Sequence, residues 1–307
     1  MEQIRNFDQL LQAALAHGRK GIAVAAPYDR NTLLAVKDAL ASGLAAPQLF
    51  GDVERMLPLL EQVQLDAGAV KLTDVRDTAQ AIDAVIESIR SGENQILMKG
   101  TVSTGTLLKH ALDRNRGLNI GRLASHLIVL QIPGLDRLLI STDGGLNIAP
   151  TLTEKADILR NAIDVARALG IETPKAACLA AVETVNPKMQ ATVDAACLCK
   201  MADRGAFPGA VVEGPWPWTT SSPPRLPGKR ASTPRCPAMP TSSWPRPSRW
   251  PTPSPRPCPP PSASAIWCCP RHLWPGSGRS WAFTAAPCPA SSSIPWPIFW
   301  TGGILKS

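Results

Sequence analysis

Up to about residue 214, apolar residues follow two alternating periods along the chain. Short runs rich in Val, Ile and Ala are typical of buried strands, and segments with apolar residues three or four positions apart are typical of helices. The expected strands are 21–27, 48–51, 95–98, 126–132, 137–141, 176–182 and 210–212, and the expected helices are 7–17, 31–42, 78–91, 107–112, 151–169 and 188–202. This alternation predicts an α/β fold with a largely parallel sheet and flanking helices.

Cap and turn residues support several of these boundaries. Thr151 and Glu154 have the spacing of a capping box, and Gly170 is placed to end the same helix. Pro133 and Gly134 form a turn signal between two of the expected strands.

The pattern stops after residue 213. Residues 214–307 contain 23 of the 31 prolines, all nine tryptophans and no acidic residue. Prolines recur there too often for a helix or a central strand. We therefore predict two regions, an α/β region over 1–213 and an aberrant Pro/Trp/Arg-rich tail over 214–307 that is disordered.

The net charge of +8 belongs to the tail alone. Residues 214–307 carry 10 basic residues, whereas residues 1–213 carry 24 acidic and 22 basic ones. Whole-chain charge is therefore a poor reason to expect nucleic-acid binding by the folded region. We find no leader, and no apolar run reaches the roughly 18 residues of a membrane span. The expectation is a cytoplasmic protein with no membrane partner.

The cysteines and histidines do not predict a metal site. Cys197 and Cys199 lie two apart on an expected helix and so point to different faces. With Cys178, we interpret them as buried free thiols of a reducing compartment. The four histidines have no metal-ligand spacing and no evident catalytic partner; they are His17, His110, His126 and His272.

A strand that runs into a glycine and then a hydroxyl-rich helix start is the clearest chemical signal. Free backbone N–H groups and small hydroxyls at such a corner form an anion cradle, and a lysine adds a positive charge. The residues concerned are Lys99, Gly100, Thr101, Ser103, Thr104 and Thr106. Ser103 or Thr104 as a simple helix cap fits the pattern equally well. The spacing is not that of a nucleotide P-loop, so ATP binding is not indicated.

Three further polar pairs flank expected strands: Arg122 with Ser125, Asp143 with Asn147, and Asn186 with Lys188. An arginine at a strand start can pair with an anion. An Asp in a loop also forms structural Asx turns, and Asn-Pro is an ordinary helix-start signal. The residues alone leave structural and ligand-binding roles open.

The tail has a second interpretation that rests on the genetic code. Tryptophan has a single codon, so Trp216-Pro217-Trp218-Thr219 is encoded TGG CCN TGG ACN. Read one base earlier, these bases contain GCC and GAC, which encode Ala and Asp, as in Leu-Ala-Leu-Asp. Residues 237–241 are likewise compatible with Gly-Asp-Ala-Asp. We infer that one base was lost near Pro215, by a natural frameshift or a sequencing error; the alternative is a true low-complexity tail.

Five segments carry a family resemblance: MKGTVSTGTLLKHAL at 98–112, RLASHL at 122–127, STDGGLNIAPTLTEKADILRNAIDVARALG at 141–170, AAVETVNPKM at 180–189 and KMADRGAFPGAVVEGP at 200–215. In this order, over about two thirds of the chain, they resemble the phosphate butyryltransferase and phosphate acetyltransferase family, in particular its butyryl branch. The earlier-frame residues also resemble that family's continuation. The resemblance implies a two-lobed, mainly parallel α/β fold of the isocitrate dehydrogenase-like superfamily, with the second lobe incomplete.

The resemblance also implies a reaction. A short acyl group, butyryl or acetyl, would move between coenzyme A and inorganic phosphate, with no permanently bound cofactor or metal. Such chemistry needs a phosphate site, donors to the carbonyl oxyanion and room for the thioester. By resemblance, the cradle residues listed above bind phosphate, Asp143 and Asn147 are catalytic, and coenzyme A is bound by Arg122, Ser125, Asn186 and Lys188. A homo-oligomer is also implied.

The tail puts the activity of the literal chain in question. The family carries a late Ser-Arg pair followed by acidic residues that is thought to bind phosphate and assist proton transfer, and no acid follows residue 213 here. We expect negligible acyl transfer by the chain as written. Two alternatives to an active enzyme are an inactive frameshifted remnant and a binding protein whose basic, Pro-rich tail engages nucleic acid or a proline-reading module.

Overall fold

The computed structural model describes residues 2–119, 121–132 and 134–217, together with the backbone of three strands further on. The helices are α1 (Phe7–Ala16), α2 (Arg30–Ala41), α3 (Val53–Gln62), α4 (Thr78–Arg90), α5 (Thr104–Ala111), α6 (Leu152–Ala168) and α7 (Gln190–Asp203), with a 3₁₀ turn at Ala67–Ala69. The strands are β1 (Lys20–Ala25), β2 (Ala45–Gly51), β3 (Lys71–Asp74), β4 (Ile96–Lys99), β5 (Ser125–Gln131), β6 (Leu138–Thr142), β7 (Lys175–Ala180), β8 (Val211–Pro217), β9 (Ala265–Cys268), β10 (Arg279–Ala285) and β11 (Ile298–Trp300).

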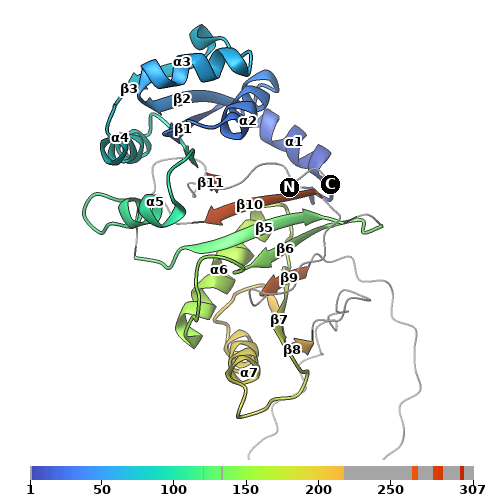
Figure 1. Cartoon of the computed structure of the whole chain (residues 1–307). Helices are drawn as coiled ribbons and strands as arrows, with labels where there is room; N and C mark the ends of the chain where they lie inside the picture. Colours follow the sequence, from blue (N-terminus) through green and yellow to red (C-terminus); the bar gives the residue numbers. More distant parts are fainter. Residues whose placement is uncertain are drawn as a thin grey trace, which may run out of the picture.

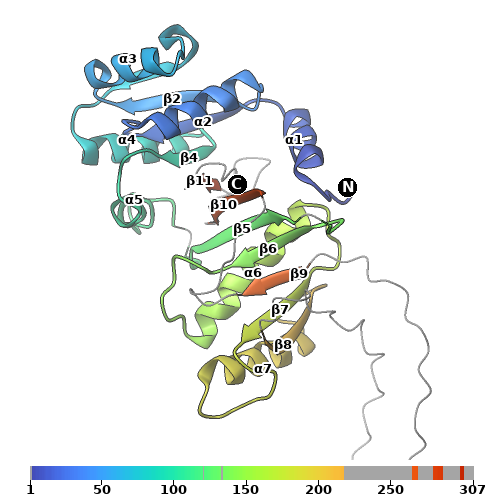
Figure 2. The same cartoon turned by 45° about the vertical axis from the view of Figure 1, so that its right-hand side comes forward.

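These strands form one sheet in the order β3-β2-β1-β4-β11-β10-β5-β6-β9-β7-β8. Neighbouring strands are parallel except for β10 with β11, β10 with β5, and β5 with β6. Figures 1 and 2 show two lobes, with β1–β4 and α2–α5 in one and β5–β8, α6 and α7 in the other. The predicted α/β fold with a mainly parallel sheet and flanking helices is confirmed.

Helices cover both faces of the sheet in the first lobe. Because successive side chains of a strand point to opposite faces, alternate residues of β1 and β4 enter different cores. Val24 and Met98 pack with residues of α2 and α3. Ala25 and Leu97 pack instead with residues of α4 and α5. The corner between β4 and α5 is therefore held from both sides.

The second lobe packs around α6. Thr151 caps this helix, and Thr151 and Glu154 make the reciprocal hydrogen bonds of a capping box, as predicted. Leu159 and Ile163 of α6 lie in one buried cluster with Leu127 of β5 and Ile140 of β6. This packing fixes the hairpin of β5 and β6, whose outer end carries the polar residues described below.

The sequence did not predict every element. Helix α3 was missed because it contains Pro58, which removes a backbone donor inside the helix. Strand β8 extends to Pro217, and β9, β10 and β11 lie in the stretch expected to be disordered. The remaining residues of that tail lie outside those the structure describes, so the division at residue 213 stays a prediction. Of the described helices, none has the length and apolar character needed to cross a membrane.

Candidate functional site

The corner between β4 and α5 presents an exposed helix start. Ser103 is the N-cap, and its hydroxyl oxygen accepts the backbone N–H of Thr106 at 3.0 Å. The Ser103 and Thr106 hydroxyl oxygens are 2.7 Å apart. Within the described residues, the backbone N–H groups of Thr104 and Gly105 have no hydrogen-bond partner, as expected of a first helical turn. Helix capping and anion binding are therefore compatible here. Ser103 accepts the Thr106 N–H, and the N–H groups of Thr104 and Gly105 stay available to an anion.

Gly100 fixes where this helix begins. Its backbone N–H donates to the carbonyl of Ala25 at 2.8 Å, so the loop is bonded to β1. A Cβ atom at Gly100 would lie 2.2 Å from the carbonyl oxygen of Ala26. Thr101 adds a second attachment, since its hydroxyl donates to the same carbonyl oxygen at 3.1 Å. Only glycine allows this close approach of two backbones.

Lys99 folds back over the loop. Its Nζ lies 3.3 Å from the carbonyl oxygens of Gly100 and Val102. The side chain thus stabilises the loop and adds a positive charge close to it. Lys99 thus lies beside the other residues of the corner, and a role for it in phosphate binding stays a prediction.

Asp143 and Asn147 form a tight turn after β6. Oδ1 of Asp143 accepts the backbone N–H groups of Gly145 and Leu146 at 3.1 and 2.9 Å. Oδ2 accepts the Asn147 side-chain amide at 2.5 Å and its backbone N–H at 3.3 Å. This is an Asx-type turn, the structural alternative to a ligand-binding role that the sequence allowed. In the described structure these contacts position the loop, and a catalytic role for either residue stays a prediction.

His126 lies beside this turn, a neighbour that the sequence did not suggest. Its Nδ1 is buried and has no hydrogen-bond partner among the described residues. A Cβ atom at Gly145 would lie 3.5 Å from that nitrogen. Burial lowers the pKa of His126 below its ordinary value, and the negative charge of Asp143 partly offsets this effect. The imidazole is therefore held in its neutral form close to a carboxylate.

One apolar cluster connects the two polar corners. Val102, between Gly100 and Ser103, belongs to a buried cluster that also contains Ala124, just before β5. Leu146, inside the Asp143–Asn147 turn, packs against the same cluster. In addition, Asn147 Nδ2 donates to the carbonyl of Ala124 at 3.0 Å. The cradle, the segment that starts β5 and the loop after β6 are thus neighbours.

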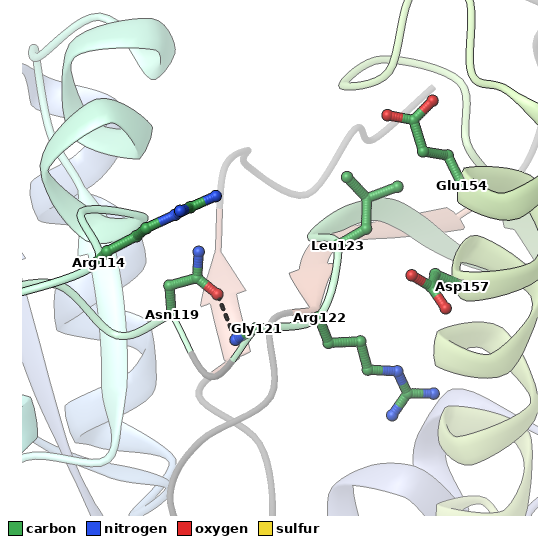
Figure 3. A pocket seen from close by; sticks show the side chains of 7 residues that line it. All are labelled: Arg114, Asn119, Gly121, Arg122, Leu123, Glu154 and Asp157. Atoms are coloured by element: carbon green, nitrogen blue, oxygen red, sulfur yellow. Dashed lines mark hydrogen bonds between the residues drawn. The ribbon is translucent and has the colours of Figure 1, made fainter.

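Arg122 lines a hollow next to this cluster. Both terminal nitrogens of its guanidinium donate to Oδ2 of Asp164 at 3.1 Å. The hollow has a volume of about 460 Å³ and is lined by Arg114, Asn119, Gly121, Arg122, Leu123, Glu154 and Asp157. In Figure 3, Arg114 and Asn119 lie on one side of it, and Glu154 and Asp157 of α6 lie on the other. Arg114 was not singled out from the sequence, because an isolated surface arginine carries no pattern.

Ser125, the first residue of β5, has no exposed surface. Its hydroxyl accepts the side-chain amide of Asn161 at 2.9 Å, and the same amide donates to the Leu123 carbonyl at 2.8 Å. Ser125 therefore helps to fix the backbone that carries Arg122. Because Ser125 is fully buried and its hydroxyl is bonded to Asn161 of α6, it cannot touch a ligand directly in this structure. Any effect of Ser125 on ligand binding would come from the position it gives to the residues around it.

Asn186 and Lys188 lie in an exposed loop between β7 and α7. Oδ1 of Asn186 accepts the Lys188 backbone N–H at 2.9 Å, and the Asn186 backbone N–H donates to the Thr192 hydroxyl at 2.9 Å. These bonds shape the loop before α7. The hydrogen bonds of Asn186 in the described structure are made with Lys188, Met189 and Thr192, all within this loop and the start of α7.

Known proteins match most of the described chain. A family model described as "Phosphate acetyl/butaryl transferase" matches residues 84–217. The chain is 38% identical to the phosphate butyryltransferase of Clostridium beijerinckii over 212 residues, which are 69% of this chain and 70% of that protein. It is 37% identical to the phosphate acetyltransferase of Rhizobium meliloti over 213 residues, 69% and 67% of the two chains. A branched-chain phosphotransacylase from Enterococcus faecalis V583 is similar in structure, with a TM-score of 0.55, 28% identity, and coverage of 64% of this chain and 68% of that one.

Proposed function

This chain belongs to the phosphate acetyl/butyryl transferase family, and we propose that its cradle binds the inorganic phosphate that exchanges with coenzyme A on a short acyl group. The observation that carries the proposal is the exposed start of α5. The Thr104 and Gly105 N–H groups are available to an anion there, next to the Ser103 and Thr106 hydroxyls. A helix N-terminus favours negative charge, so phosphate suits these donors.

The acyl donor is proposed to approach from the direction of Arg122. A coenzyme A thioester carries phosphate groups, and a guanidinium is the side chain best suited to bind them. Arg122 and Arg114 line one hollow, which adjoins the cluster beneath the cradle. Phosphate in the cradle would then attack the thioester carbonyl, the C–S bond would break, and coenzyme A would leave as its thiolate, giving an acyl phosphate. The Asp143–Asn147 turn would hold the adjacent loop. Asn186 and Lys188 are proposed as outer contacts of the coenzyme.

The acyl group is proposed to be short, and its length stays open between butyryl, acetyl and branched chains. The named relatives span all three. The reaction needs no bound cofactor in this scheme, because the coenzyme A thioester and phosphate are both substrates. We further propose a cytoplasmic enzyme that acts as a homo-oligomer.

Two measurements test the proposal on the 307-residue chain. The first is the shift of the melting temperature with inorganic phosphate, against chloride at matched ionic strength. A rise that saturates with phosphate supports the cradle, and an identical response to both salts contradicts it. The second is phosphate-dependent release of thiol from butyryl-CoA, acetyl-CoA and isobutyryl-CoA. Because the tail contains no carboxylate, we expect phosphate binding with little turnover.

A further inference from the structure

Arg114 and Arg122 line the same hollow but have different surroundings. Both terminal nitrogens of Arg122 donate to Asp164 at 3.1 Å, so part of its charge is already balanced within the protein. The Arg114 side chain makes no hydrogen bond and no ion pair with any residue that the structure describes. In Figure 3 it extends into the space between its own turn and helix α6.

The carboxylates on the opposite side of the hollow have partners of their own. Oε2 of Glu154 accepts the backbone N–H of Thr151 at 2.7 Å, and Oδ1 of Asp157 accepts from Arg160 at 2.7 Å. Glu154 also lies in the first turn of α6, where the helix dipole favours negative charge. Of the charged side chains that line the hollow in the described part of the chain, Arg114 is therefore the one without a partner.

The backbone that carries Arg114 is fixed by a tight turn. Oδ1 of Asp113 accepts the backbone N–H groups of Asn115 and Arg116 at 2.9 and 2.8 Å. The Gly117 N–H donates to the Asp113 carbonyl at 3.0 Å, and a Cβ atom at Gly117 would lie 2.5 Å from that oxygen. Because the turn is already ordered, a ligand that binds Arg114 has only the side chain to immobilise.

This turn follows the C-terminal end of α5, whereas the cradle lies at the N-terminal start of the same helix. Helix α5 has eight residues, so its two ends are about 12 Å apart. A single inorganic phosphate is too small to contact both ends. In a coenzyme A thioester, a long pantetheine arm separates the sulfur from the phosphate groups. A thioester carbonyl near the cradle therefore leaves the phosphate groups of the coenzyme to be bound elsewhere.

We propose that Arg114 binds a phosphate group of coenzyme A at the end of α5 opposite to the cradle, and that it contributes more to the affinity than Arg122. This assignment rests on the proposed function. A guanidinium donates charge-assisted hydrogen bonds to phosphate oxygens. Arg122 shares its donors between Asp164 and the ligand, whereas Arg114 gives all of its donors to the ligand.

Equilibrium titrations of the 307-residue chain with coenzyme A, dephospho-coenzyme A and pantetheine test the proposal. Arg114→Gln should weaken coenzyme A binding by more than about tenfold, and by more than Arg122→Gln does, because an entire charge-assisted contact is lost. The loss should shrink as the salt concentration rises. Pantetheine has no phosphate group, so it should bind the wild type and Arg114→Gln equally.

Arg116→Gln is the matched control. It removes the same charge from the same turn, but Arg116 does not line the hollow, so coenzyme A should bind this variant almost as tightly as the wild type. Dephospho-coenzyme A identifies the group that Arg114 contacts. Equal losses with both coenzymes would assign the pyrophosphate, and a loss confined to coenzyme A would assign the 3′-phosphate; either result supports the proposal.

Three outcomes would overturn this inference alone, with coenzyme A still bound by the wild type. These are equal effects of Arg114→Gln and Arg116→Gln, a larger loss from Arg122→Gln than from Arg114→Gln, and equal weakening of pantetheine. If the wild-type chain bound none of the three ligands, the proposed function would fail together with this inference. The phosphate-induced shift in melting temperature reports on the cradle separately, and it should be the same in Arg114→Gln as in the wild type.

Discussion

The side-chain amide of Asn147 donates to the backbone carbonyl of Ala124 at 3.0 Å, and so attaches the loop after β6 to the segment that starts β5. The same amide donates to Asp143. One side chain therefore connects the turn and the neighbouring strand, and Leu146 between them packs into the cluster under the cradle. The loop is positioned by residues that lie more than 20 positions apart in the sequence.

Replacement of Asn147 by alanine should loosen this loop. The change leaves the Ala124 carbonyl and one Asp143 oxygen with fewer donors, and a lost hydrogen bond at a partly buried group costs about 1–3 kcal/mol. We expect the free energy of unfolding in urea to fall by about that amount. Ile148→Ala is the control from the same loop, because Ile148 is 84% exposed. Equal effects of the two substitutions would contradict the role given to Asn147.

Gly100 and Gly105 should respond in opposite ways to alanine. At Gly100 the added Cβ atom meets backbone at 2.2 Å, and overpacking against backbone costs about 3 kcal/mol. At Gly105 nothing lies within 4 Å, and alanine in a helix is about 0.5–1 kcal/mol more stable than glycine. Chemical denaturation of the two variants measures both effects. A tolerated alanine at Gly100 would contradict the close approach of Gly100 to the backbone of Ala26.

Ser103→Ala should weaken both helix α5 and the binding of phosphate. Loss of an N-cap hydroxyl costs about 1 kcal/mol. The backbone N–H of Thr106 would lose its acceptor, and one hydroxyl of the cradle would disappear. Ser103→Thr keeps the hydroxyl and should restore most of the phosphate-induced shift in melting temperature. Unchanged phosphate binding in the alanine variant would mean that Ser103 caps the helix and does not contact phosphate.

His126 should make the protein less stable in mild acid. Its pKa in the folded state is lowered from 6.5, mainly by burial. Below pH 6.5 the unfolded chain therefore takes up a proton that the folded chain does not, and the free energy of unfolding falls as the pH decreases. Above that pH the contribution is complete. Urea unfolding from about pH 8 to about pH 5 should show this slope, and it should be smaller in His126→Gln.

Asp143→Asn provides an independent check of the same pair. The Asp143 carboxylate raises the pKa of His126 against the larger effect of burial. Its removal should therefore lower the pKa of His126 further, as followed by the imidazole proton signals in NMR titration. An unchanged pKa of His126 in this variant would mean that the two groups are not close in solution.

Arg122→Gln should reduce the affinity for butyryl-CoA and leave that for phosphate unchanged. Loss of a charge-assisted contact to a phosphate group corresponds to about tenfold weaker binding, or about 1.4 kcal/mol. Arg5→Gln is the control, since Arg5 is an exposed arginine paired with Asp136. Equilibrium titrations of the two ligands separate the effects. Equal weakening of phosphate and thioester binding would place Arg122 in the cradle instead.

Local signals in the sequence predicted most of the described fold. The capping box of Thr151 and Glu154 is present in the structure, and the family resemblance is confirmed by the relatives. Helix α3 was missed because Pro58 conflicts with the local pattern, and packing of Met56 and Leu60 in the core outweighs that preference. Strands β9 to β11 were missed because they are short and lie in a stretch whose frequent prolines hid them, although their own residues, such as Ile, Trp and Phe, favour strands.

The sequence predicted the individual segments of the candidate site but not that they lie close together. Each segment has a recognisable polar pattern, but their proximity depends on the burial of Val102, Ala124 and Leu146 in one cluster. The neighbourhood of His126 and Asp143 likewise results from antiparallel pairing of β5 and β6. Neither relationship has a signature along the chain, and neither does the complete burial of Ser125, a residue predicted to bind coenzyme A.

The cluster beneath the cradle also contains Ile82 and Val85 of α4, a helix that carries none of the proposed ligand contacts. Core substitutions there would shift the loops that we propose to hold both substrates. Substitutions in α4 are therefore expected to change the affinity for phosphate and for the thioester together. Mutagenesis limited to residues that touch a ligand would not find them.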